Sequence, residues 1–253
     1  MRIHRLLSGF LLIGLLLTLG MGAAQADGPG TPSATTNNFP FIAHLPLTLY
    51  DAYPCPDIPI QLTPANGATL DTLIPMFRWD SGSPTCVRYL NLRVYSDAAG
   101  EILNRSAIIS KTEGEGAYRF SDNFEPGTTY YWRIRFKCKN NVYGPFSELR
   151  SFTAGSEGTL PPMPAQLSPP NGSRTESRRV TMRWEAVPGA SMYLLHYRAE
   201  GARGSIYIWV NQLSYSRTFE KNKTYEWWVA AVNDYGISEA TGKWRFTTPA
   251  NAP

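Results

Sequence analysis

Histidine, the most common general base in enzymes, is scarce in this 253-residue chain. Beyond His4 near the N-terminus, the only histidines are His44 and His196. A serine or cysteine nucleophile needs a base that a third group orients, and no such set is indicated. The carboxylates are scattered over predicted turns and outward positions, which does not favour the carboxylate pair of a glycosidase. We therefore predict no catalytic residue and no cofactor.

The three cysteines, Cys55, Cys86 and Cys138, are the other chemically reactive group. Neither a CxxC nor an HxxxH spacing occurs, so we predict no zinc site and no other metal site. In an oxidising compartment, three cysteines most simply form one disulfide and leave one free thiol; three free thiols are the alternative.

The N-terminus indicates that this chain is exported. Arg2 and Arg5 precede an apolar run over 6–21, and Ala24-Gln25-Ala26 follows it. A basic head, a short apolar middle and an A-x-A end are typical of a signal peptide, which we assign to residues 1–26. The run is shorter than the roughly 20 residues that span a bilayer, so a transmembrane anchor is the less favoured interpretation.

The predicted mature chain is nearly neutral and has no transmembrane segment. Removing Arg2 and Arg5 lowers the basic residues from 24 to 22, against 20 acidic ones, which leaves +2. Nucleic-acid binding needs a strong basic surface, so we predict no nucleic-acid partner.

An internal repeat dominates the rest of the sequence. Gln61-Leu62-Thr63-Pro64 is matched by Gln166-Leu167-Ser168-Pro169, at an offset of 105 residues. Later matches are offset by about 95 residues, so the second copy is about ten residues shorter. The remaining matches run in the same order: Phe77–Asp80 with Met182–Glu185, Phe124–Tyr130 with Phe219–Tyr225, Trp132 with Trp227, Tyr143-Gly144 with Tyr235-Gly236, and Phe152-Thr153 with Phe246-Thr247.

Each copy consists of short alternating segments between turn residues, which is typical of a two-sheet sandwich. Successive side chains of a strand point to opposite faces of the sheet. The apolar alternate positions are therefore expected in the core, led by Trp79 and Trp184. The other inward rows are Tyr130, Trp132, Ile134 and Phe136; Leu90, Leu92 and Val94; Tyr225, Trp227, Val229 and Ala231; and Tyr193, Leu195 and Tyr197.

Several of these segments resemble fibronectin type III domains. Residues 222–238 resemble the sixth strand of that family, and Trp79 and Trp184 match its core tryptophan on the second strand. Glu125–Tyr130 resembles the turn into the sixth strand, with Tyr130 as the corner tyrosine. The chain is thus similar to tandem fibronectin type III proteins of the bacterial secreted type. The resemblance implies an all-β fold with two immunoglobulin-like β-sandwiches, at residues 55–154 and 161–249, joined by a linker at 155–160.

The resemblance also suggests how the cysteines pair. In such a sandwich the third and sixth strands are antiparallel neighbours, which places Cys86 close to Cys138. We predict a Cys86–Cys138 disulfide, with Cys55 as a rival partner at the same pole. The second copy has no cysteine, so the bond is not a requirement of the fold.

Outward-facing side chains are the best candidates for a ligand face. In the second copy, alternation directs Trp228 and His196 outward, and either Tyr207 and Trp209 or the intervening residues must join them. We name Trp228, His196 and Trp209 as a possible aromatic face for sugars or a protein anchor. In the first copy the corresponding outward face is basic, with the candidate residues Arg93, Arg133, Arg135 and Lys137.

A segment before the first sandwich remains without an assigned role. Residues 27–54 form a proline-rich leader that we expect to be disordered or extended. Its apolar part, Phe39–Leu49, either packs on the first sandwich or docks to a partner. Taken together, the sequence predicts a secreted or cell-surface interaction or adhesion module without catalysis. Its partner would be a protein or a cell-envelope polysaccharide; a carbohydrate-binding accessory protein is the alternative.

Overall fold

The computed structural model describes residues 57–83, 85–111, 113–139 and 141–250. The predicted signal peptide, the leader with its Phe39–Leu49 segment, and Cys55 lie outside the described residues. Within the described part every regular element is a β-strand, and none of it forms a helix long and apolar enough to span a membrane. The predicted all-β fold of two tandem sandwiches is confirmed.

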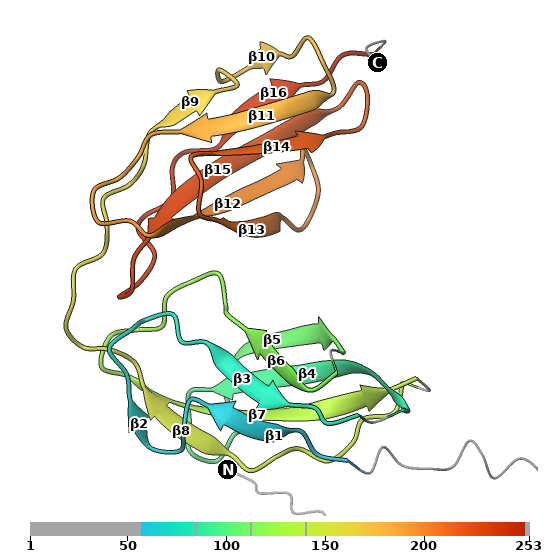
Figure 1. Ribbon diagram of the computed structural model, residues 1–253, viewed down its shortest axis with the longest axis vertical. Helices are drawn as coiled ribbons and strands as arrows, with labels where there is room; N and C mark the ends of the chain where they lie inside the picture. The colour runs from blue at the N-terminus through green and yellow to red at the C-terminus, as the bar shows by residue number, and fades with distance from the viewer. Residues whose placement is uncertain (1–56, 84, 112, 140, 251–253) are drawn as a thin grey trace, which may run out of the picture. The chain divides into compact units, whose positions relative to one another are not determined.

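The first eight strands form the first sandwich (Figure 1). One sheet has three strands in the order β1-β3-β6, and the other has five in the order β2-β8-β7-β4-β5. The central pair, β4 and β7, is antiparallel, as the resemblance implied for the third and sixth strands. The bounds are β1 Ile60–Thr63, β2 Ala68–Thr69, β3 Phe77–Asp80, β4 Val87–Tyr95, β5 Leu103–Ser110, β6 Glu115–Tyr118, β7 Thr129–Cys138 and β8 Arg150–Thr153.

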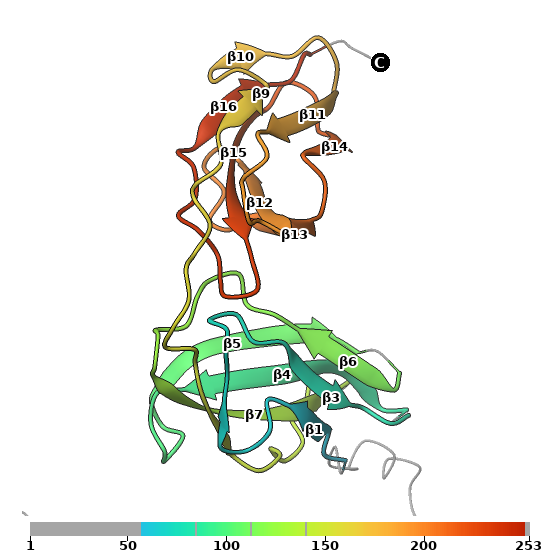
Figure 2. The ribbon, with the colours of Figure 1, turned by 60° about the vertical axis from the view of Figure 1, so that its left-hand side comes forward.

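The last eight strands repeat this arrangement in the second sandwich, as a second view also shows (Figure 2). The sheet orders are β14-β11-β9 and β10-β16-β15-β12-β13. The shorter second copy is visible in β13, which has 5 residues where β5 has 8. The bounds are β9 Gln166–Ser168, β10 Ser173–Arg174, β11 Arg179–Trp184, β12 Met192–Ala199, β13 Ile206–Val210, β14 Ser214–Thr218, β15 Thr224–Val232 and β16 Trp244–Thr247.

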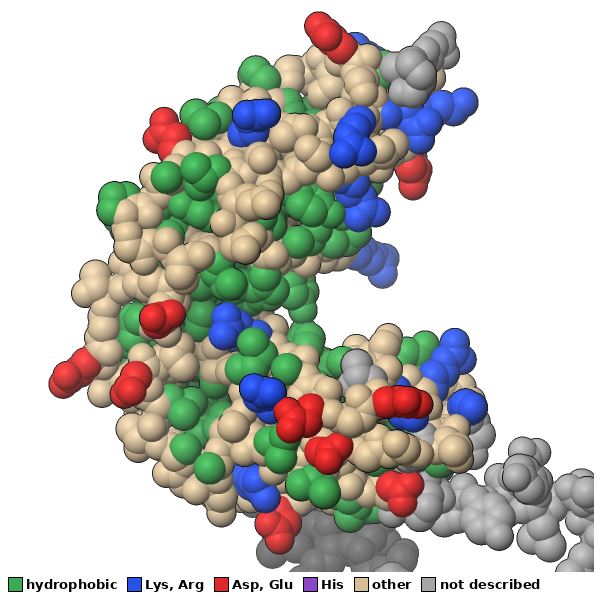
Figure 3. Space-filling model, in the orientation of Figure 1, with side chains coloured by type: hydrophobic (Ala, Val, Ile, Leu, Met, Phe, Trp, Pro, Cys, Tyr) green, Lys and Arg blue, Asp and Glu red, His purple; other side chains and the backbone are tan. Residues whose placement is uncertain are grey.

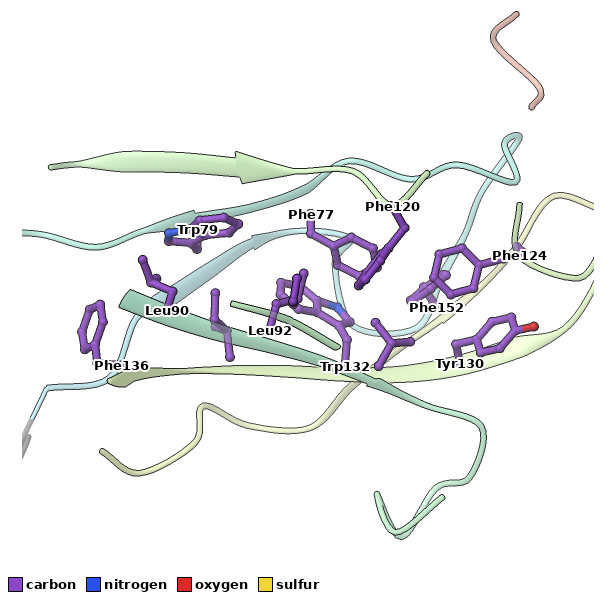
Figure 4. Close-up of a cluster of buried hydrophobic side chains, with 14 of the residues drawn as sticks. Phe77, Trp79, Leu90, Leu92, Phe120, Phe124, Tyr130, Trp132, Phe136 and Phe152 are labelled. Atoms are coloured by element: carbon purple, nitrogen blue, oxygen red, sulfur yellow. The ribbon is translucent and has the colours of Figure 1, made fainter. Parts of the chain in front are cut away.

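Each sandwich has its own aromatic core. In the first, Trp79 and Trp132 are fully buried, and Phe77 packs edge-on against Trp132 with ring centroids 5.2 Å apart (Figure 4). In the second, Trp184 and Trp227 take the corresponding places. All the predicted inward rows are buried. Alternation assigned these faces correctly because the side-chain period of a strand is a local property of its backbone.

Two repeated hydrogen bonds show how closely the copies correspond. The buried amide of Gln61 donates to the Trp132 carbonyl at 3.2 Å, and Gln166 donates to the Trp227 carbonyl at 3.1 Å. These bonds explain why a polar residue is tolerated on the inner face of the first strand of each copy. The hydroxyl of Tyr130 accepts a hydrogen bond from the backbone N–H of Glu125 at 3.2 Å, as expected of a corner tyrosine.

The cysteines differ from the prediction. Cys86 and Cys138 are neighbours, with their sulfur atoms 3.2 Å apart. However, Cys86 is a free thiol, whereas Cys138 is disulfide-bonded, so the predicted Cys86–Cys138 bond is not formed. Proximity of the strand ends was predictable from the resemblance, but proximity alone does not select the bonded pair.

Of the two described cysteines, we expect only Cys86 to be alkylated without prior reduction. In denaturant without reductant, peptide mapping should place an alkyl label on Cys86 and not on Cys138, because the Cys86 thiol is free. Cys86→Ser should abolish the label on this peptide. Label found on Cys138 and not on Cys86 would show that Cys86 is the bonded cysteine and Cys138 the free one, which would contradict the structure.

Candidate ligand-binding faces

Two neighbouring strands place four cations on one outer surface of the first sandwich. Arg133, Arg135 and Lys137 alternate with buried residues along β7, and Arg93 lies on β4. Arg93 is directly opposite Arg133 in the antiparallel register. The structure thus brings together all four basic residues that the sequence nominated. We call this set, Arg93, Arg133, Arg135 and Lys137, the cationic face.

The segment that follows β7 returns beside it and adds aromatic rings. Gly144 N–H donates to the Phe136 carbonyl at 3.0 Å, and Ser147 N–H donates to the Ile134 carbonyl at 2.8 Å. Phe146 lies between Gly144 and Ser147 in the sequence, and Tyr143 precedes Gly144. The two bonds therefore hold both rings beside the outward side chains of β7.

Three guanidinium groups surround one of these rings. The guanidinium carbons of Arg135, Arg133 and Arg93 lie 4.1, 4.3 and 5.4 Å from the centroid of Phe146. The carbon of Arg135 is also 3.9 Å from the centroid of Tyr143. Such cation–π contacts contribute about 0.5–1 kcal/mol each at exposed sites, and together they restrict the rotamers of these long side chains.

Polar contacts hold two of these arginines further. Nε and Nη2 of Arg133 donate to the Tyr95 hydroxyl at 3.2 and 3.0 Å. Nε of Arg135 donates to Oδ1 of Asn91 at 3.4 Å. Burial lowers the pKa of Arg135 below its ordinary value, and the positive charge of Arg93 lowers it further. Arg93 and Arg135 both lie over the ring of Phe146, so their like charges are close together.

No acidic side chain in the described part of the chain forms an ion pair with any of the four cations of the cationic face. The second sandwich differs, because its outer-face residue Glu226 pairs with Arg198 at 2.8 Å and with Arg245 at 3.2 Å. On the side of the first sandwich that Figure 3 displays, basic and acidic side chains are interspersed as well.

The corresponding face of the second sandwich carries an aromatic pair in place of two cations. His196 and Trp228 are opposite each other in the register of β12 and β15, as Arg93 and Arg133 are in the first sandwich. Their rings are stacked, with centroids 5.2 Å apart and an interplanar angle of 9°. Nζ of Lys243 lies 5.2 Å from the centroid of the Trp228 ring. Burial lowers the pKa of His196, which keeps the imidazole neutral near pH 7.

Trp209 is not part of that pair. It faces outward together with Tyr207, since Ile208 and Val210 contact the inner core. In the register, however, Tyr207 is opposite His196, whereas Trp209 is opposite Leu194, which is buried. The three predicted aromatic residues therefore occupy two rows, and the residue adjacent to His196 on β13 is Tyr207. Sequence reasoning had left open which set of β13 faces outward.

The rings around the cations were not recognised from the sequence. Tyr143 was noted only as a repeat match, and Tyr95, Asn91 and Phe146 were not nominated. The signal available was weak: the Tyr-Gly-Pro-Phe run follows a strand with three outward cations.

No family model matches the chain, and the comparison with curated proteins found no match. Among solved structures, it is similar to the chicken CNTN1 FN1–FN3 domains, with a TM-score of 0.34 and 16% identity over 78% of this chain and 68% of that one. The class of fold follows from the strand order and the two tryptophan cores. They define two tandem immunoglobulin-like sandwiches of the fibronectin type III kind.

Proposed function

We propose that this protein is a non-catalytic interaction module, exported to the cell surface or beyond, whose first sandwich binds an acidic partner protein through the cationic face. The observation that carries the proposal is the group of four adjacent cations that form no ion pair with a described acidic side chain. Positive charges without counter-charges attract an acidic surface and speed its approach.

The described residues contain no candidate set of catalytic side chains, which supports the proposal of a binding role. Within the described residues, no group of three or more His, Cys, Asp or Glu side chains could hold a metal ion. His196, the only described histidine, is stacked on Trp228, and its Nδ1 is buried without a hydrogen-bond partner among these residues. It is therefore not placed as the base of a nucleophile.

A protein partner is favoured over a polysaccharide by the state of the aromatic rings. Sugars bind aromatic residues by stacking on a free ring face. Cations lie over the rings of Phe146 and Tyr143, and Trp228 is stacked with His196 and flanked by Lys243. An anionic polysaccharide, held by charge alone, is the alternative that the binding test includes.

We expect the full chain to bind immobilised polyglutamate at low ionic strength and to lose this binding as salt screens the charges. Replacing all four residues of the cationic face with Gln should weaken binding by about tenfold or more, because several ion pairs are lost together. Surface plasmon resonance on polyglutamate, dextran sulfate and uncharged dextran measures the effect.

A matched control removes the same charge elsewhere. Gln at Arg174, Arg179, Arg183 and Lys221, four exposed cations of the second sandwich, lowers the net charge equally and should leave most of the binding intact. Equal losses in the two variants, or no binding to polyglutamate at all, would refute the proposal. If the chain bound dextran sulfate but not polyglutamate, the partner would be an anionic polysaccharide and not an acidic protein.

A further inference from the structure

The cationic face contains a more specific feature than its charge, namely the three guanidinium groups around Phe146. Two of them are anchored by side-chain hydrogen bonds from Nε, to Tyr95 and to Asn91. The Nε of the third, Arg93, is buried and has no hydrogen-bond partner among the described residues. A buried donor without a partner costs free energy until a ligand or water satisfies it.

Donors remain available for a ligand after these anchors are counted. A guanidinium carries five N–H donors in a planar fork. Among the described residues, no acceptor is bound by the terminal nitrogens of Arg135 or Arg93, and Arg133 uses only its Nε and Nη2. The ring of Phe146 holds these forks around a common centre.

The second sandwich shows that the fold does not need cations at these positions. His196 and Trp228 occupy the places of Arg93 and Arg133 and stack instead of repelling. Like charges directly opposite each other across a sheet destabilise it. The cationic pair of the first sandwich is therefore not a requirement of the fold, since the same topology forms without it, and a binding role is consistent with its presence.

We propose that Arg93, Arg133 and Arg135 form an oxyanion-binding site around Phe146, which recognises a carboxylate, sulfate or phosphate group by bidentate hydrogen bonds. Carboxylates and phosphates match the planar guanidinium fork, whereas an ammonium group acts as a point charge. This inference rests on the proposed function, in which the partner is acidic, and adds that recognition requires the guanidinium geometry as well as the charge.

Replacing Arg with Lys keeps the positive charge and removes the planar guanidinium group, so the test separates the effect of geometry from that of charge. The full chain is compared with the triple variants R93K/R133K/R135K and R93Q/R133Q/R135Q by surface plasmon resonance on polyglutamate and on dextran sulfate. Isothermal titration with inorganic phosphate adds a small-molecule probe. We expect the Lys variant to bind both polymers about tenfold more weakly than the unmodified chain, since hydrogen bonds to charged groups are lost, and heat of phosphate binding to disappear.

Arg93→Lys alone is the control for a folding defect, because the buried Nε of Arg93 has no hydrogen-bond partner among the described residues that the substitution could remove. It too should weaken polymer binding, and circular dichroism should match that of the unmodified chain. If the Lys variants bind like the unmodified chain while the Gln variant does not, charge suffices and the oxyanion site is refuted, but the proposed function stands. If the Gln variant also binds normally, both fail.

Discussion

Replacing Trp184 with alanine is expected to unfold the second sandwich while leaving the first one folded. Trp184 is 1% exposed and packs against Tyr193, with ring centroids 5.6 Å apart. Truncating a buried tryptophan typically costs about 3–5 kcal/mol, a large part of the roughly 5–15 kcal/mol that stabilises a domain. The first sandwich has a separate core around Trp79 and Trp132, so we expect it to remain folded.

Amide hydrogen exchange read by mass spectrometry distinguishes the two sandwiches in the intact chain, because peptides from each report separately. Protection in β11, β12 and β15 should fall, whereas protection in β4 and β7 should not change. Arg183→Ala is the matched control, since Arg183 precedes Trp184 on the same strand and is exposed. An equal loss of protection in both sandwiches would show that the two cores do not fold independently.

The second large effect is expected from adding one methyl group at Gly116. This glycine on β6 is opposite Trp79 in the register, and a Cβ there would lie 2.6 Å from Cε2 and Cζ2 of the tryptophan. The ring cannot move aside easily, because Trp79 is fully buried and its Nε1 donates to Oγ of Ser81 at 3.1 Å. Overpacking of this kind costs about 1–3 kcal/mol, so Gly116→Ala should destabilise the first sandwich.

The control for Gly116→Ala is Gly204→Ala, because a Cβ at Gly204 meets no atom within 4 Å. Thermal unfolding followed by circular dichroism compares the two variants. In a Trp79→Phe background, the smaller ring should reduce the cost of Gly116→Ala, and a double-mutant cycle measures this coupling. A neutral Gly116→Ala variant would contradict the close packing of the ring on β6.

Much of the fold was predictable because the relevant signals are local. Trp132, Ile134 and Phe136 alternate with Arg133 and Arg135, and the structure buries the first set and directs the second outward. The limits of such reasoning are equally specific. Alternation could not choose between the two sets of β13, because Tyr207 and Trp209 are as apolar as Ile208 and Val210. Here contact with the inner core decided the outcome.

The candidate site was predictable in its charges but not in its surroundings. Alternation identified the four cations, and the register of β4 and β7 then placed Arg93 opposite Arg133, 40 positions away in the numbering. The contact with Phe146 depends on the irregular segment after β7, which follows no periodic pattern. For a related reason, alternation could not place the aromatic residues relative to one another, and the register of β13 put Trp209 opposite Leu194 and Tyr207 opposite His196.

The sequence by itself determined two repeated sandwiches with tryptophan cores and the outward direction of the basic and aromatic residues, because the period of a strand is set by its own backbone. Only the tertiary structure decided what those outward residues meet. It placed three guanidinium groups around one ring, stacked His196 on Trp228, and left Cys86 unbonded beside Cys138. Such contacts join segments distant in sequence, and their geometry depends on strand register and on the paths of the connecting loops.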